Sequence, residues 1–228
     1  PEDIRDPPPF PAERVDYQAV LDYKNSLFDR AFARFKEHGE NFRYMDFAAE
    51  NAMWLNDYAI FVALKDRFGG KVWGDWPVGI RDRHDEALRK HGSELAEPIL
   101  REKFLQYIFD HQWRVLKNHC RDRHIQIIGD IPIFVDRDSA DVWANPHLFK
   151  LDEAANPLVV AGVPPDLFSS TGQHWGNPVY DWAQARMTGY QWWAARLGRA
   201  LEMVDAVRLD HFRGFESAWE IPGGELSA

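Results

Sequence analysis

The feature that most constrains the fold is a long apolar run at residues 125–135 (IQIIGDIPIFV). A continuous apolar run rich in β-branched residues predicts a strand buried inside a parallel sheet. A helix is predicted at residues 191–204, and a second apolar strand follows at residues 206–211. Strand, helix and parallel strand form one βαβ unit, so the predicted fold class is α/β.

The first 120 residues have a different pattern, in which apolar side chains recur every three or four positions, as in amphipathic helices. Asp16 is a predicted N-cap, and Gly69-Gly70 is a predicted stop. Pro-rich residues precede this region. We therefore predict a linker at 1–15, a mainly helical subdomain at 16–120 with helices near 16–35, 45–68, 81–97 and 98–116, and a segment with two core strands at 121–228.

The region between the two predicted strands, residues 136–181, is rich in Pro and Gly and is predicted to be irregular. Residues 149–151 and 158–160 could form a small hairpin around Asn156-Pro157. Residues 163–178 contain many aromatic and amide side chains for a connector. Such a loop is either a binding loop or a self-packed Ω-loop, and the residues alone leave both open.

Composition narrows the possible partners. A net charge of −9 argues against nucleic acid, because a phosphate-binding protein usually has a basic face. The single cysteine, Cys120, excludes an internal disulfide and a multi-cysteine zinc site. No apolar run reaches the roughly 18 residues of a membrane span, so no membrane partner is expected. The 10 Trp, 15 Phe and 7 Tyr are mostly core residues, but a surplus of Trp also suits stacking on sugar rings.

The best candidates for chemistry are Arg208 and Asp210, which close the second predicted strand. Residues two apart on a strand point to the same face, and a nearby positive charge favours the ionised carboxylate. An ionised carboxylate at a strand's C-terminal end can act as a nucleophile in glycosyl transfer, although a structural ion pair is an equal alternative. Asp130 closes the first predicted strand and would lie at the same mouth, unless it only caps a turn.

The chain has no convincing metal or phosphate motif. Asp136, Asp138 and Asp141 lack the spacing and central Gly of an EF-hand loop. His174 and His211 are not at a familiar metal-ligand spacing. There is no Gly-rich phosphate loop and no nucleophile elbow, so no metal and no cofactor are expected.

Taken together, several motifs resemble those of the 4-α-glucanotransferases (amylomaltases, or disproportionating enzymes) of glycoside hydrolase family 77. The upstream residues 54–59 (WLNDYA) and Gln112-Trp113 fit the same family. The resemblance covers most of the chain from about Asp16 onward. The motifs that carry it are residues 129–135 (GDIPIFV), 138–146 (DSADVWANP), 160–166 (VAGVPPD), 171–178 (TGQHWGNP) and 208–214 (RLDHFRG).

The resemblance implies a (β/α)₈ barrel with inserted subdomains that transfers α-1,4-glucan segments between maltooligosaccharides by double displacement. By motif position, Asp210 corresponds to the nucleophile, Arg208 would orient it, and Asp130 would bind the donor sugar. The loop from Pro164 to Trp175 would guide the acceptor glucan. The implied substrate-binding residues are Asp130, Pro164, Asp166, Phe168, Gln173, Trp175, Asn177 and His211.

The chain also departs from the family pattern. The family's acid/base Glu and second Asp follow later strands, and Glu216, Glu220 and Glu225 do not match the acid/base motif. A closed barrel needs eight strands and about 250 residues. We therefore expect a central, inactive portion of a cytoplasmic enzyme, whose partners are glucans and the remaining barrel segments. The alternatives are a non-catalytic glucan-binding fragment and an α-amylase-type hydrolase.

Overall fold

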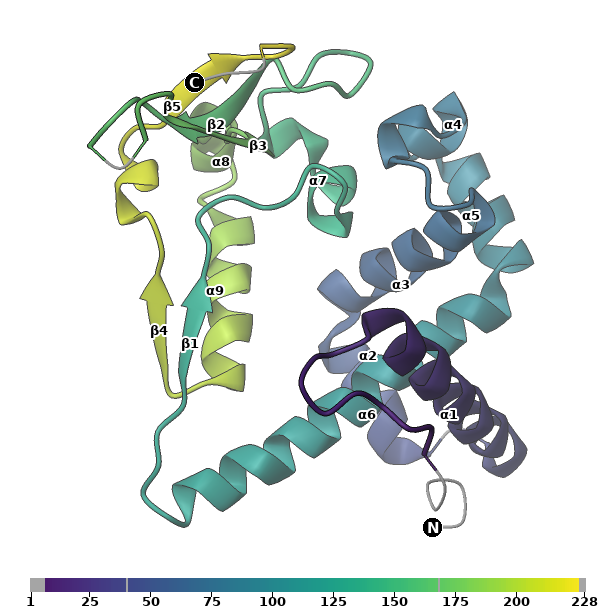
Figure 1. The fold of residues 1–228 in the computed structure, drawn as a ribbon. Helices are drawn as coiled ribbons and strands as arrows, with labels where there is room; N and C mark the ends of the chain where they lie inside the picture. Colours follow the sequence, from purple (N-terminus) through teal and green to yellow (C-terminus); the bar gives the residue numbers. More distant parts are fainter. Residues whose placement is uncertain (1–6, 40, 168, 226–228) are drawn as a thin grey trace.

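The computed structural model describes residues 7–39, 41–167 and 169–225. Its first half is helical, as predicted (Figure 1). The long helix α6 runs diagonally across the view and leads into the second half of the chain. The elements of the first half are α1 (Tyr17–His38), α2 (Phe42–Glu50), α3 (Ala52–Arg67), the 3-10 helix η2 (Trp73–Asp75), α4 (Val78–Arg81), α5 (Asp85–Glu94) and α6 (Ala96–Arg121).

The predicted ends of the first helices are confirmed where a local signal marks them. The Asp16 carboxylate accepts a hydrogen bond from the Ala19 backbone N–H at 3.1 Å and caps α1. The predicted stop at Gly69-Gly70 is also confirmed, since α3 ends at Arg67 and the two glycines have φ angles of 65° and 77°, left-handed values that favour glycine.

The single helix predicted over residues 45–68 is wrong, because Asn51 divides it into α2 and α3. The Asn51 side chain is buried, donates to the Phe47 carbonyl at 2.9 Å and accepts from the Trp54 indole N–H at 3.0 Å. A side chain that bonds the backbone on one side and a ring on the other fixes a bend between the two helices.

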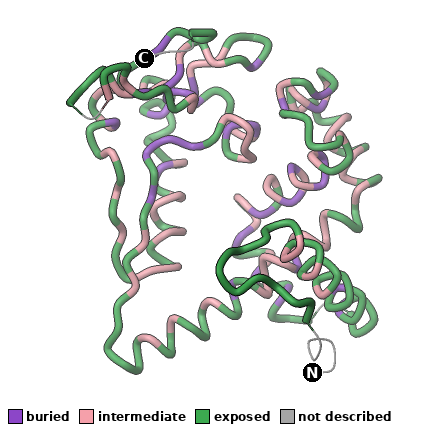
Figure 2. Tube along the Cα trace, in the orientation of Figure 1, coloured by how far each residue is buried: buried purple, intermediate pink, exposed green. Residues whose placement is uncertain are grey.

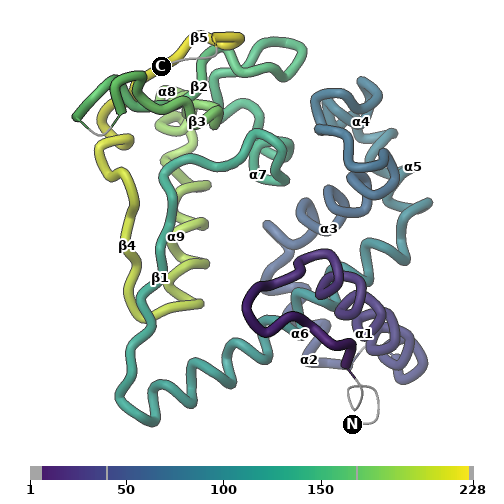
Figure 3. The backbone as a smooth tube through the Cα atoms, in the orientation of Figure 1, coloured from purple at the N-terminus to yellow at the C-terminus, as the bar shows by residue number. Residues whose placement is uncertain are grey.

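The second half of the chain contains the predicted βαβ unit. β1 and β4 pair in parallel, with Asp130 opposite Arg208, and α9 packs beside them (Figure 1). Figure 3 shows the two strands side by side although they are far apart in sequence. The elements are β1 (Ile128–Ile131), α7 (Ala140–Ala144), η3 (Pro146–Leu148), β2 (Val159–Val163), β3 (Gln173–Pro178), α8 (Trp182–Met187), α9 (Gln191–Met203), β4 (Ala206–Leu209), η4 (Phe212–Phe215) and β5 (Trp219–Pro222).

The prediction that residues 125–135 form one buried strand is wrong in two ways. β1 covers only Ile128–Ile131 and stops before Pro132, which has no N–H for a ladder. β1 and β4 are also largely exposed, and Ile128 is 72% exposed (Figure 2). Their sheet has two strands and one covering helix, so side chains on its other face meet solvent.

A second, three-stranded sheet replaces much of the irregular region predicted at residues 136–181. Its strand order is β3-β2-β5, and both pairings are antiparallel. The expected hairpin is confirmed in part, since Leu151 bridges Pro157 and the Leu158 N–H donates to the Lys150 carbonyl at 2.9 Å. β2 then continues into pairings with β3 and β5 that local sequence patterns did not indicate.

The main hydrophobic core joins the two halves. It brings α3 and the η2–α4 segment against α7, the second sheet and α9, through large side chains such as Trp73, Trp143 and Tyr180. A smaller aromatic core of Phe32, Phe35, Tyr44 and Phe104 lies between α1, α2 and α6. Most Trp and Phe side chains therefore stabilise the fold.

The C-terminal end of α6 holds the turn that leads into β4. The Trp113 indole N–H donates to the Met203 carbonyl at 2.6 Å, and the Lys117 ammonium donates to the Val204 carbonyl at 3.1 Å. Gly129 of β1 lies so close to this turn that a Cβ at position 129 would be 2.9 Å from a methyl group of Val204. These contacts fix where β4 begins relative to β1.

None of the described helices has both the length and the apolar character to cross a membrane.

Candidate active site

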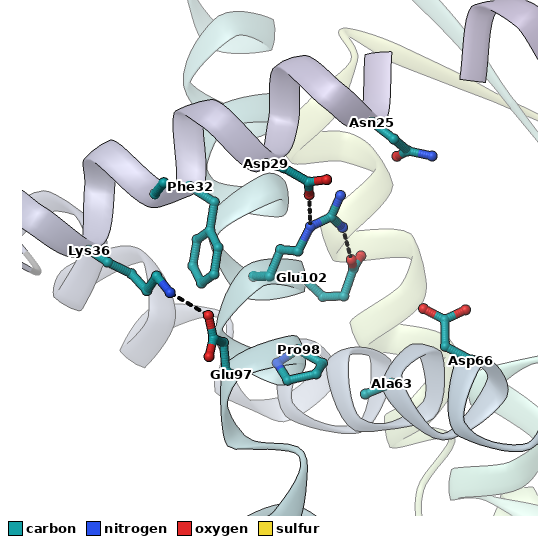
Figure 4. Close-up of a pocket in the computed structure, with 11 residues that line it drawn as sticks. Asn25, Asp29, Phe32, Lys36, Ala63, Asp66, Glu97, Pro98 and Glu102 are labelled. Atoms are coloured by element: carbon teal, nitrogen blue, oxygen red, sulfur yellow. Dashed lines mark hydrogen bonds and ion pairs between the residues drawn. The ribbon is translucent and has the colours of Figure 1, made fainter. Parts of the chain in front are cut away.

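A groove in the helical half of the chain contains none of the predicted site residues. It lies between α1, α3 and α6 and has a volume of about 870 Å³ (Figure 4). Five of its charged side chains form ion pairs: Lys36 with Glu97, and Arg101 with both Asp29 and Glu102 at 2.8 Å. Burial raises the pKa of Glu102, and the charge of Arg101 only partly offsets this effect. The ion pairs of this groove therefore connect α1 to α6.

The predicted residues instead meet at the C-terminal ends of β1 and β4. Arg208 and Asp130 are register partners, and the guanidinium grips the Asp130 carboxylate with two hydrogen bonds, of 3.0 Å from Nε and 2.6 Å from Nη2. Nη2 also donates to the Asp210 carboxylate at 3.2 Å. One guanidinium therefore bridges the two carboxylates, and we call Asp130, Arg208 and Asp210 the strand-end triad.

The exposure of the strand-end triad bears on whether it is only a structural ion pair. The side chains of Arg208, Asp130 and Asp210 are 63%, 54% and 58% exposed. The hydrogen bond to Asp130, with the charges of both carboxylates, raises the pKa of Arg208. Ion pairs this exposed contribute little to stability. Folding alone therefore does not explain why three charges gather at this point.

An aromatic pair lies directly after the strand-end triad. The rings of Trp175, on β3, and His211, which follows Asp210, meet edge to face at 4.9 Å between centroids. His211 has a φ of 47°, an uncommon value for a non-glycine residue that turns the chain sharply after β4. Phe134 backs Trp175 at 6.2 Å. We call Trp175 and His211 the ring wall.

The loop between β2 and β3 carries Pro164 and Asp166, and it ends earlier than predicted because residues 173–178 form β3. Its first turn is closed by its own polar groups: the Asp166 carboxylate accepts from the Ser169 N–H at 2.8 Å. The Ser169 hydroxyl donates to the Gly172 carbonyl at 2.6 Å. The loop thus has the self-packed character of an Ω-loop at its base. Phe168 lies outside the described residues.

The remaining predicted residues contact the ring wall or the backbone. Gln173 accepts a hydrogen bond from the Trp175 indole N–H at 3.0 Å, which fixes the ring's orientation. The Asn177 amide donates to the Val135 carbonyl at 2.9 Å. Asn177 therefore holds the segment after β1, an arrangement that the sequence did not indicate.

Two residues near this segment were missed by the sequence analysis. Tyr180 and Arg196 both donate to backbone carbonyls just after β1. A signal for Arg196 was present, since it is a charge at helical spacing from Trp192 and Trp193 on an otherwise apolar helix face.

The acidic residues after β1 have structural partners. The Asp136 carboxylate accepts from the Asp138 N–H at 2.7 Å, and Asp138 pairs with Lys65 at 2.6 Å. Over the residues that the structure describes, no group of three or more His, Cys, Asp or Glu side chains could hold a metal ion.

Comparison with known proteins identifies the family. The family model described as 4-alpha-glucanotransferase, glycoside hydrolase family 77, matches residues 2–228. The chain belongs to the 4-alpha-glucanotransferase family. This membership agrees with the family resemblance seen in the motifs.

Relatives within the 4-alpha-glucanotransferase family align along nearly the whole chain. The enzyme of that name from Thermus thermophilus is 49% identical over 218 residues, covering 94% of this chain and 44% of the relative. The one from Synechocystis is 46% identical over 225 residues, covering 97% and 45%. The amylomaltase of Streptococcus agalactiae, solved in complex with acarbose, matches with a TM-score of 0.86 and 40% identity, covering 93% and 43%. The chain thus spans less than half the length of these relatives.

Proposed function

We propose that this chain supplies the nucleophile-bearing part of a 4-α-glucanotransferase site, with Asp210 as the nucleophile. The observation that carries the proposal is the single guanidinium that bridges two carboxylates at the ends of two parallel strands. Arg208 holds Asp210 in one orientation, while the second carboxylate, Asp130, is free on its exposed side to accept hydrogen bonds from sugar hydroxyls.

The chemistry proposed is a retaining double displacement. The Asp210 carboxylate attacks the anomeric carbon of an α-1,4-glucan, the glycosidic C–O bond breaks, and the leaving oxygen takes a proton from a general acid. The 4-hydroxyl of an acceptor glucan then attacks the glycosyl-aspartate, gives up its proton and releases the carboxylate. The ring wall offers an apolar face for a pyranose and helps to exclude water, which favours transfer over hydrolysis.

We assign the general acid to none of the described carboxylates. Glu220 pairs with Lys150 at 2.6 Å, and Glu216 accepts from its neighbour Ser217 at 2.5 Å. Both carboxylate oxygens of Asp130 accept hydrogen bonds from Arg208, so Asp130 is assigned to holding Arg208 and the donor sugar. We propose that further segments of the protein supply the acid/base group.

The same reasoning applies to the architecture. We propose that β1 and β4 are neighbouring strands of a (β/α)₈ barrel, with a linker at 1–15, a helical insertion at 16–120 and a barrel segment at 121–228. The open faces and edges of the two-stranded sheet support this proposal. Maltooligosaccharides and the other barrel segments would be the partners.

We also propose a cytoplasmic location, which the single cysteine supports, and fractionation of the source cells would test it.

An activated donor tests the nucleophile without the missing acid. In α-maltosyl fluoride the leaving group is fluoride, which departs without protonation, so Asp210 needs no partner acid for the first step. We expect intact-mass measurement to show the addition of one maltosyl group, located by peptide sequencing at Asp210 and absent in Asp210→Asn. Labelling at another residue would contradict the assignment. Maltotriose, which needs the acid, should give no longer or shorter products with this chain.

A non-catalytic glucan-binding role is the second candidate. The exposed ring wall supports it, because stacked rings bind sugars without any chemistry. Calorimetric binding of maltoheptaose together with no labelling by α-maltosyl fluoride would favour this role over the transferase site.

A further inference from the structure

The segment that leaves β1, residues 132–135, is held by side chains. Arg196 Nη2 donates to the Pro132 carbonyl at 2.8 Å, and Nη1 donates to the Ile133 carbonyl at 3.2 Å. The Tyr180 hydroxyl donates to the same Ile133 carbonyl at 2.8 Å. The Ile133 carbonyl therefore has two side-chain donors, from α9 and from the start of α8, that fix its direction.

Both donors are themselves fixed by packing. Tyr180 is fully buried, and burial raises the pKa of its hydroxyl, so it remains a donor. The Arg196 guanidinium lies over the rings of Trp192 and Trp193, at 5.5 and 4.9 Å from their centroids. Groups packed in this way lose little further entropy when they bind the segment.

The held segment touches the ring wall through Phe134. The Phe134 ring stacks on Tyr180 at 5.9 Å and meets Trp175 at 6.2 Å, and Trp175 in turn meets His211 at 4.9 Å. A line of ring contacts therefore runs from the buried Tyr180 to the side chain next to Asp210. A shift of residues 132–135 would displace Phe134 and, through it, the ring wall.

We propose that Tyr180 and Arg196 are positioning residues that set the ring wall for glucan binding, by fixing the backbone of residues 132–135. The proposal rests on the proposed function, since it concerns how that site holds its sugar. It assigns the two residues to glucan affinity and places neither in contact with the reacting atoms.

The test uses the full 228-residue chain with Tyr180→Phe, which removes only the hydroxyl, and Arg196→Lys, which keeps the charge but loses the two-pronged grip. We expect the dissociation constant for maltoheptaose to rise about fivefold in each, which corresponds to one net hydrogen bond. The saturating rate of labelling by α-maltosyl fluoride should fall by less than about twofold. Tyr190→Phe and Arg186→Lys, on exposed side chains, are the matched controls and should change neither quantity.

A spectroscopic reading separates positioning from general loosening. The edge-to-face contact with Trp175 shifts the ring protons of His211, and their NMR signals are assigned by their loss in His211→Gln. In Tyr180→Phe and Arg196→Lys these signals should move toward the values of an exposed histidine. If glucan affinity falls but the His211 signals stay in place, or if affinity and labelling fall equally, the proposal is overturned.

The same measurements distinguish this proposal from the proposed function. If wild-type chain is not labelled at Asp210, the nucleophile assignment fails. The positioning proposal still stands or falls separately, on whether the two variants move both the His211 signals and the maltoheptaose affinity. If Tyr180→Phe fails to fold by circular dichroism, Arg196→Lys decides the question alone.

Discussion

Two regions of this molecule use the same set of charges, one arginine between two carboxylates, for different purposes. In the helical groove Arg101 joins Asp29 of α1 to Glu102 of its own helix, and the Arg101 and Glu102 side chains are only 24% and 15% exposed. At the strand ends Arg208 joins Asp130 and Asp210, and all three are more than half exposed. Arg101, Asp29 and Glu102 connect α1 to α6, while the strand-end triad leaves its three charges exposed to solvent.

The difference lies in the backbone beneath each set. In the groove α1 packs on α6, and this packing brings Asp29 of α1 next to Arg101 of α6. At the strand ends Asp130 and Arg208 lie on two paired strands and are aligned by sheet register. Register places charges with a precision that an exposed ion pair by itself does not provide.

The largest expected effect is on the strand-end triad. Asp210→Asn removes the proposed nucleophile but keeps the size of the side chain, so labelling by α-maltosyl fluoride should fall by more than about 10³-fold. The free energy of unfolding, measured in urea, should change by less than about 0.5 kcal/mol, because the site is exposed. A large loss of stability would mean that the strand-end triad is structural after all.

A buried arginine–carboxylate cluster should behave in the opposite way. Asp110 of α6 is 5% exposed and accepts from Arg114 at 2.6 Å and Arg199 of α9 at 3.1 Å. Asp110→Ala removes a hydrogen-bonded partner of both Arg114 and Arg199, while Arg199 keeps Glu202 at 2.9 Å, and it should cost about 2 kcal/mol in urea unfolding. Asp29→Ala, on an exposed side chain, is the control and should cost less than about 1 kcal/mol.

An intermediate effect is expected from Arg208→Lys. Lysine keeps the positive charge but cannot grip Asp130 with two hydrogen bonds while reaching Asp210. Labelling at Asp210 should therefore fall about tenfold, with the unfolding midpoint unchanged. Labelling at the wild-type rate would show that charge alone, without the bridge, is sufficient.

The smallest effect concerns pH and the helical groove. Because the pKa of Glu102 is raised in the folded state, the folded chain binds this proton more tightly than the unfolded chain, and the ionised carboxylate lowers stability as pH rises above about 4.5. Glu102→Gln removes this penalty. Its melting temperature should exceed that of wild type near pH 7, by the equivalent of less than about 1 kcal/mol, and match it near pH 4. A lower melting temperature near pH 7 would mean that the pairing with Arg101 outweighs burial.

Local signals account for the parts of the fold that the sequence predicted well. The Asp16 side chain caps the start of α1, the positive φ angles of Gly69 and Gly70 follow the end of α3, and the apolar spacing of α9 is visible within its own residues. The division of residues 45–68 was missed because an Asn inside a helical pattern does not reveal that its side chain is buried. The pairing of β2 with β5 was missed because it joins distant segments. β3 was missed because Gly, Asn and Pro within residues 173–178 do not form a strand pattern.

The sequence by itself determined that Arg208 and Asp210 lie on one face of a strand, because the strand period is two, and that a parallel partner strand precedes α9. The tertiary structure decided which residue of that partner meets Arg208. The pairing of Asp130 with Arg208 depends on where β4 begins, and Lys117 and Trp113 of α6 hold that turn. Register is a contact between distant segments, so no local pattern encodes it, and it is register that brings the two carboxylates to one guanidinium.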